Sequence, residues 1–187
     1  YNREADAGGY ALTEIDFDGV KTGAVYKNFP RSNGETLVKG KEKDFLVYDG
    51  DGLYEYDLAT QTKEEVFRWL DSDINGNYVR NVGVLEDGRV VAVIQDWEQD
   101  ANSGVALLTR TDASQVPQKE TIVLATLNGS YNLKPLMVEF NKNSDKYRIT
   151  MKEYLDTENW DGDDYLALMS DAVTNLNNDI TSGSCPD

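Results

Sequence analysis

The chain has 187 residues, of which 34 are acidic and 18 basic, giving a formal net charge of −16 and an isoelectric point near 4.3. This negative charge repels phosphate backbones and anionic lipid surfaces, so we expect neither nucleic acid nor a membrane surface as a partner. Histidine is absent and Cys185 is the only cysteine, which excludes Ser-His-Asp chemistry, histidine-ligated zinc and an internal disulfide within this chain.

The N-terminal part of the sequence predicts a β-hairpin. Residues 10–16 alternate loosely in polarity and turn at Asp18-Gly19 into residues 20–26. An Asp-Gly pair between two alternating runs is a strong hairpin signal, because tight primed turns need positive φ. We therefore expect an antiparallel pair at the start of the chain.

Similar units of strand, turn and strand recur further along. They pair 44–48 with 53–58, and 78–85 with 89–94 followed by 105–109. The intervening piece, 63–70, suits an outer strand or a short amphipathic helix, and we favour a helical end. Short strands at regular spacing predict a sandwich, a barrel or a propeller, and this repeated unit is typical of propeller blades.

The pattern changes near Pro117, after which a strand, a helix, a strand and a helix are predicted in turn. The two strands cover 119–127 and 147–154. The first helix has Asn132 as its candidate N-cap, and the second covers 163–181 with Gly183 as its C-cap. The continuous apolar run of the first strand predicts burial on both faces. We expect the last helix to turn an apolar face inward, formed by Tyr165, Leu168, Met169, Ala172, Val173, Leu176 and Ile180.

This change of pattern predicts an α+β protein with two regions. Residues 1–117 form a β-rich region of antiparallel hairpins that resemble propeller blades. Residues 118–187 form a partial βαβα unit, incomplete because the sequence stops where a third strand would begin.

Two loops of the second region are candidates for binding a ligand. In open α/β sheets, ligands bind at the carboxyl ends of the strands. Aromatic faces with amides and carboxylates suit sugar recognition, because rings stack on C–H faces and polar groups bond hydroxyls. The candidate residues are Asn128, Gly129, Ser130 and Tyr131 after the first strand, and Tyr154, Asp156 and Trp160 after the second.

Other acidic clusters favour structural roles. The loops that begin at Asp49 and Asp73 imitate calcium loops, but position twelve is Thr60 in one and Val84 in the other, so both lack the closing glutamate. Adjacent carboxylates such as Glu64 and Glu65 are common in so acidic a chain. We therefore expect no metal, no cofactor and no catalytic residue.

The second region resembles the extracellular solute-binding proteins of ABC transporters, of the carbohydrate-type, maltose-binding-like group. The resemblance begins near Lys119 and rests on Phe140-Asn141-Lys142, Tyr147-Arg148-Ile149 and Gly183-Ser184-Cys185-Pro186-Asp187. It implies capture of a sugar or oligosaccharide outside the cell, delivery to a membrane permease, and a lipid anchor in a Gram-positive bacterium. The first region is similar to the propeller-like part that some such lipoproteins carry ahead of the binding domain.

Two alternatives stay open at this point. The chain could be a stand-alone β-rich interaction or adhesion domain without catalytic activity, or a glycoside-active enzyme that uses paired carboxylates. In every case the incomplete α/β half would leave apolar surface uncovered. We therefore expect that half either to form homo-oligomers with another copy or to pack against the β-rich region of its own chain.

Overall fold

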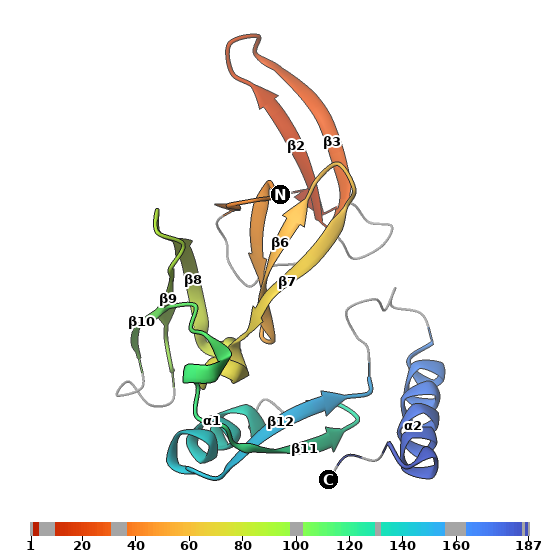
Figure 1. Cartoon of the computed structure of the whole chain (residues 1–187). Coiled ribbons are helices and arrows are strands. Elements are labelled where there is room, and N and C mark those ends of the chain that lie inside the picture. The colour runs from red at the N-terminus through yellow and green to blue at the C-terminus, as the bar shows by residue number, and fades with distance from the viewer. Residues whose placement is uncertain are drawn as a thin grey trace. The chain divides into compact units, whose positions relative to one another are not determined.

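The computed structural model describes residues 2–3, 10–30, 37–97, 103–129, 132–155, 164–184 and 186. Its fold is mixed α+β, with strands gathered in four sheets and α-helices in the C-terminal part (Figure 1). The α+β class expected from the sequence is therefore confirmed. The chain divides into two compact units, the first formed by Tyr1–Arg68 with Tyr78–Leu108, the second by Trp69–Asn77 with Thr109–Asp187.

The first unit contains three antiparallel sheets, whose strand orders are β1-β2-β3, β4-β5-β6-β7 and β10-β9-β8. The strands are β1 (Asn2–Arg3), β2 (Tyr10–Asp16), β3 (Lys21–Phe29), β4 (Val38–Lys39), β5 (Phe45–Tyr48), β6 (Gly52–Asp57), β7 (Thr62–Arg68), β8 (Val79–Val84), β9 (Val90–Ile94) and β10 (Gly104–Leu108). The three predicted hairpins are all present.

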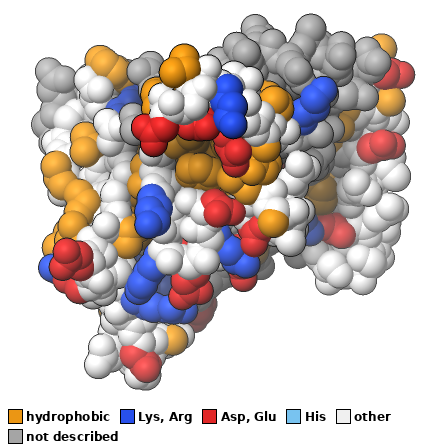
Figure 2. All heavy atoms as spheres, turned by 90° about the horizontal axis from the view of Figure 1, so that it is seen from above, with side chains coloured by type: hydrophobic (Ala, Val, Ile, Leu, Met, Phe, Trp, Pro, Cys, Tyr) orange, Lys and Arg blue, Asp and Glu red, His pale blue; other side chains and the backbone are white. Residues whose placement is uncertain are grey.

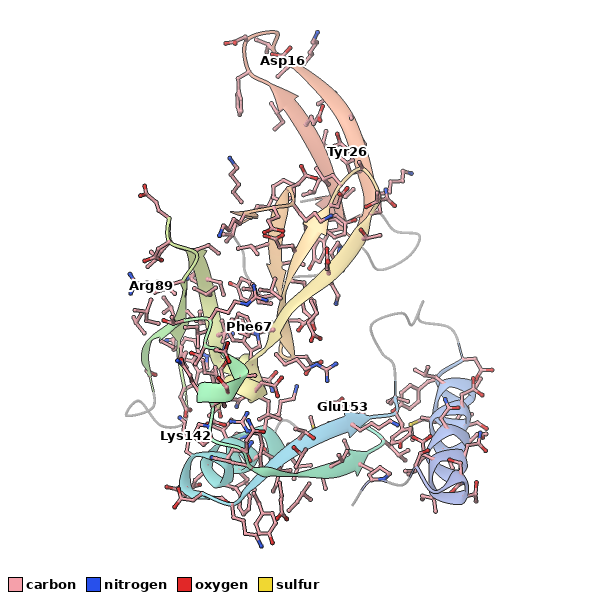
Figure 3. The ribbon with its side chains drawn as sticks, viewed as in Figure 1. Asp16, Tyr26, Phe67, Arg89, Lys142 and Glu153 are labelled. Atoms are coloured by element: carbon pink, nitrogen blue, oxygen red, sulfur yellow. The ribbon has the colours of Figure 1, made fainter. Side chains whose placement is uncertain are left out.

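The turn between β2 and β3 differs from its prediction in conformation. The carboxylate of Asp16, labelled in Figure 3, accepts a hydrogen bond from the Gly19 N–H at 2.8 Å. The positive φ, 51°, falls on Val20 and not on the glycine. A Cβ at position 19 would lie 2.4 Å from the Asp16 carboxylate, so any other residue would displace that side chain.

The core of the first unit lies where the base of this hairpin meets the β4–β7 sheet. Phe29, Val47 and Tyr56 are buried together there. The Phe29 ring packs edge-on against Tyr56 at 4.9 Å and against Phe45 at 5.9 Å, the geometry that aromatic quadrupoles favour. The outer part of the hairpin, from Ile15 onward, is exposed.

The ambiguous segment 63–70 forms a strand that ends in a helical turn. β7 runs to Arg68, and the 3-10 helix η1 (Trp69–Ser72) follows, so the predicted helical end is confirmed. A second 3-10 helix, η2 (Gly76–Tyr78), leads into β8. Trp69 is fully buried, and its carbonyl accepts the Ile74 N–H at 3.0 Å, which folds the segment Trp69–Asn77 onto itself within the second unit.

In the second unit, two parallel strands are joined through a helix. The elements are η4 (Ala113–Gln115), β11 (Glu120–Thr126), α1 (Leu133–Asn143), β12 (Tyr147–Glu153) and α2 (Tyr165–Ser182). The strands pair in parallel without a shift from Glu120 opposite Tyr147 to Thr126 opposite Glu153. Such a pair needs a crossover connection, which α1 supplies.

Three details of this unit correct the sequence-based expectations. β11 is half-buried and not buried on both faces, because burial of a strand's faces depends on the layers that pack on the sheet and not on the strand's own apolar run. Asn132 precedes α1 in a helical conformation and makes no capping hydrogen bond. On α2, only Ala172 of the expected inward face is buried, although Gly183 ends the helix in the left-handed conformation as predicted.

Asn141 joins α1 to β12. Its buried side chain accepts the Ile149 N–H at 2.7 Å and donates to the Ile149 carbonyl at 2.9 Å. The carbonyl of Asn141 in turn accepts a hydrogen bond from Lys119 at 2.7 Å. The asparagine therefore completes the backbone hydrogen bonding of a strand edge that faces no other described strand.

Candidate functional site

The carboxyl ends of β11 and β12 bring two loops together. Past the regular ladder, the Tyr154 N–H donates to the Thr126 carbonyl at 3.0 Å, and the Leu155 N–H donates to the Leu127 carbonyl at 2.8 Å. The residues that leave the two strands therefore start side by side. This is the edge of a parallel sheet at which α/β proteins bind ligands.

Gly129 and Glu153 form the centre of this edge. The Gly129 N–H donates to the Glu153 carboxylate at 2.9 Å, and the Lys134 ammonium lies 4.0 Å from the other oxygen of that carboxylate. Glu153 is labelled at the end of β12 in Figure 3. A Cβ at position 129 would lie 2.0 Å from the carboxylate, so any other residue there would displace the Glu153 side chain from its bond to the backbone.

Asn128 is the candidate residue whose side chain is most open to solvent at this edge. The residue is exposed, and its carbonyl accepts the Thr126 hydroxyl at 2.8 Å, which fixes the backbone of the loop. Its amide offers one acceptor and two donor hydrogens, the combination that pairs with vicinal hydroxyls. Asn128 and the Glu153 carboxylate are thus polar groups on adjoining parts of one edge.

The Tyr154 side chain is hydrogen-bonded to α2. Its hydroxyl donates to the Asp179 carboxylate at 2.6 Å, and the Lys152 ammonium pairs with the same oxygen and lies 5.0 Å from the centre of the Tyr154 ring. These contacts hold α2 against the end of β12. The ring of Tyr154 remains half-buried, so it can offer a face but not a free hydroxyl.

The electrostatics of this triad follow from its hydrogen bonds. The bond from Lys152, with a second from Tyr154, lowers the pKa of Asp179 below its ordinary range. The same carboxylate raises the pKa of Lys152 and that of Tyr154. All three groups therefore keep their usual charge states near neutrality, and none of them is prepared for proton transfer.

The remaining predicted ligand residues, Ser130, Tyr131, Asp156 and Trp160, lie outside the described residues. The structure thus brings Asn128, Gly129 and Tyr154 to one edge of the sheet. Sequence reasoning missed Glu153, Lys134 and Asp179. The alternation of β12 places Glu153 at the strand end, but its bond to Gly129 depends on strand register, which a single sequence does not specify.

The loop that begins at Asp73 has a structural role. The Arg148 guanidinium donates to the Asp73 carboxylate at 2.9 Å and to the carbonyls of Leu70 and Asp71 at 3.3 and 2.6 Å. Asp73 takes a positive φ of 55°. A strand residue of the second unit thus binds the loop that the sequence likened to a calcium site.

The carboxylate pairs considered for catalysis do not converge in the structure. Glu64 and Glu65 are neighbours on β7, so their side chains point to opposite faces of the sheet. The pKa of Asp87 is lowered, chiefly by its hydrogen bond from Arg89, which makes that carboxyl a poor proton donor. In the part of the chain that the structure describes, no cluster of three or more metal-binding side chains is found.

Among the described residues, neither α1 nor α2 combines the length and hydrophobicity required to cross a bilayer. On the face seen in Figure 2, acidic and basic side chains are interspersed with hydrophobic ones. No family model, no curated protein and no solved structure matches the chain.

Proposed function

We propose that the second unit is the start of a sugar-binding lobe of an extracellular solute-binding protein that serves an ABC transporter. The observation that carries this proposal is the shared carboxyl edge of β11 and β12, where Asn128, Gly129 and Glu153 adjoin. The first unit is then a blade-like β region that precedes the binding lobe. Delivery to a membrane permease and a place at the cell surface belong to the same proposal.

The chemistry of the edge suits a neutral polyhydroxylated solute. A sugar hydroxyl can donate to the Glu153 carboxylate while a neighbouring hydroxyl bonds the Asn128 amide. The half-buried ring of Tyr154 supplies an apolar surface for the C–H face of the sugar. An anionic solute is disfavoured, because it would meet the Glu153 carboxylate and a chain of net charge −16.

The parallel strands also explain why the resemblance falls on certain residues. Asn141, from the Phe-Asn-Lys match, bonds both backbone groups of Ile149, from the Tyr-Arg-Ile match. The two matched motifs therefore meet in space and fix the helix beside the strand. This supports the view that they form one structural unit of a binding lobe.

Ligand-observed NMR on the chain tests the proposal, because saturation transfer detects solutes that bind with dissociation constants on the order of 1 mM. We expect transfer to a subset of mono- and oligosaccharides, and none to amino acids or short peptides. Changing Asn128 to Ala should remove the signal, whereas Asn143→Ala, an exposed asparagine on the last turn of α1, should retain it. No transfer to any sugar, or equal transfer with Asn128→Ala, would overturn the proposal.

A further inference from the structure

β10 is an open sheet edge with an apolar face. It has β9 as its only strand neighbour among the described residues and forms the outer strand of its sheet (Figure 1). Val105 and Leu107 are 70% and 51% exposed, and across the ladder they stand opposite Val93 and Val91. Since paired residues share a face, these four side chains form one apolar surface.

The opposite face of this sheet is already a core. Val82, Val90 and Ala92 are buried there. β9 and β10 are therefore apolar on both faces, whereas an antiparallel sheet with one solvated face normally alternates apolar and polar residues. Such a composition is typical of a sheet that is covered on both sides.

The hydrogen-bond alternation shows which backbone groups of β10 face outward. The Leu85 N–H donates to the Arg89 carbonyl at 2.8 Å, so Arg89 directs its backbone groups toward β8. Successive residues of a strand alternate, and Ala92 therefore directs its groups toward β10, where the register pairs it with Ala106.

Since Ala106 bonds to β9, its neighbours Val105 and Leu107 direct their N–H and C=O groups away from β9. These four groups meet no strand in the described part of the chain. The spacing of these N–H and C=O groups is that of an antiparallel ladder, in which every second residue exchanges two backbone hydrogen bonds with the residue opposite it.

Three other edge strands of the first unit, β4, β7 and β8, carry features that block pairing and that β10 lacks. β4 has only two residues, one of them a lysine. β7 carries Lys63, Glu64, Glu65 and Arg68, and its pairing with β6 is interrupted by a register shift at Val66. On β8 the Arg80 carbonyl accepts the Tyr48 hydroxyl. Charges, short strands and covering contacts are the devices by which proteins block edge pairing.

β10 has none of these devices in its sequence. Gly104–Leu108 reads Gly-Val-Ala-Leu-Leu, without charge or proline, and its register with β9 continues unshifted along the whole strand. An uncharged strand is also compatible with its own copy, because no like charges meet when two such strands align. A partner that recognises the chain by charge would find nothing to bind here.

We propose that β10 is a self-association edge, at which a second copy of this chain pairs its own β10 antiparallel across a two-fold axis centred on Ala106. Val105 of one copy then stands opposite Leu107 of the other, and all four outward backbone groups are hydrogen-bonded. The two three-stranded sheets become one continuous sheet, and their apolar faces join. This interface is isologous and closed, so it yields a dimer and not a filament.

Sedimentation of the chain over a wide concentration range tests the proposal, with Val105→Pro as the informative variant. Proline at 105 removes the outward N–H but no bond to β9, since that residue faces away from β9. Two interfacial hydrogen bonds are lost per dimer, so we expect the dimerisation constant to weaken about 30-fold. Leu107→Lys, which places like charges across the axis, should have at least the same effect.

Two controls separate this edge from other surfaces. Leu166→Lys introduces the same charge on α2, where the leucine is 80% exposed, and Phe17→Lys does so at the exposed tip of the β2–β3 hairpin. Both should leave dimerisation unchanged. Raising the salt concentration should strengthen it, because each copy carries a charge of −16 that salt screens.

The proposal is overturned if the unmodified chain sediments as a monomer up to its solubility limit. It is also overturned if the dimer survives both Val105→Pro and Leu107→Lys, or if Leu166→Lys alone abolishes it. Far-ultraviolet circular dichroism and melting curves of each variant establish that it is folded. Sugar binding is measured separately, so failure of one proposal leaves the other intact.

Discussion

The apolar side chains of the β4–β7 sheet are more deeply buried than those of the β11–β12 pair. In the first, Leu46, Val47, Tyr48, Leu53 and Tyr56 are buried. Phe29, at the base of the β2–β3 hairpin, packs against Val47 and Tyr56. In the second, every apolar residue of both strands is only partly buried. The difference lies in topology, because hairpins supply their own covering layer whereas parallel strands depend on layers added from elsewhere.

In the second unit, polar side chains make many of the contacts that join one element to another. Asn141 fixes α1 to β12, Arg148 fixes the segment 69–77, and Asp179 fixes α2. The first unit relies on aromatic packing instead. We therefore expect the two units to respond differently to apolar and polar substitutions.

The largest expected effect concerns the buried core of the first unit. Leu53→Ala removes a fully buried side chain and should lower the free energy of unfolding by about 2–5 kcal/mol. The matched change in the second unit, Leu124→Ala at a half-buried position, should cost about 1–2 kcal/mol, because less apolar area is lost. Denaturant unfolding followed by probes in each unit measures both values. Equal losses would contradict the comparison.

Asn141→Ala should be the most damaging polar substitution in the second unit. It leaves the N–H and the carbonyl of Ile149 without their partner in a buried position, at a cost of about 2–3 kcal/mol. Asn143→Ala, two residues further along the same helix and exposed, should change stability by less than about 0.5 kcal/mol. Chemical denaturation provides the measurement, and similar losses for the two asparagines would refute the role assigned to Asn141.

Arg148→Gln should loosen the segment 69–77. The guanidinium contributes three hydrogen bonds at a partly buried position, and we expect a loss of about 1–2 kcal/mol. Amide exchange at Asp73 and Ile74 should accelerate. Arg89→Gln, which breaks an exposed pair with Asp87 in a turn, serves as the control and should have little effect. Unchanged exchange in Arg148→Gln would show that other contacts hold the segment.

The smallest effect expected is a pH dependence of stability where Asp179 of α2 contacts Lys152 and Tyr154. The lowered pKa of Asp179 gives stability that is present above the unfolded carboxyl pKa and is lost as pH falls through the folded value. The raised pKa values of Tyr154 and Lys152 give stability that is present below their unfolded values and is lost as pH rises through the folded ones. The protection factors of the α2 amides, which correct for the intrinsic pH dependence of exchange, should therefore fall on both the acid and the alkaline side of neutrality.

Asp179→Asn should flatten the acid side of this profile, because an amide does not titrate. Asp171→Asn, an exposed carboxylate on the same helix, should leave the profile as it is. If both variants behave alike, the acid response comes from general charge repulsion and not from the Lys152–Asp179–Tyr154 contacts.

Local signals predicted much of this fold. Asp87-Gly88 marked a hairpin whose glycine adopts a φ of 86°, and Gly183 marked the end of α2 at a φ of 77°. Hydrophobic periodicity placed β11, α1, β12 and α2. These features depend on residues close together in the sequence, where turn and capping chemistry act directly.

The failures concern contacts between distant residues. The apolar run of β11 predicted burial on both faces, but burial depends on what else packs there. Asn132 looked like a helix cap, whereas Asp164 caps α2 by accepting the Ala167 N–H at 3.1 Å. Glu153 bonds Gly129 across 24 residues, so the centre of the candidate site could not be found from local pattern.

The most direct test of the account is a protein-observed NMR titration of the chain with a sugar that gives saturation transfer. We predict that the amide signals of Asn128 and Gly129 shift first and most, with smaller shifts at Tyr154, since these residues share the carboxyl edge of β11 and β12. Shifts confined to the β-rich unit, or no shift at that edge at saturating sugar, would contradict the assignment of the second unit as a solute-binding lobe.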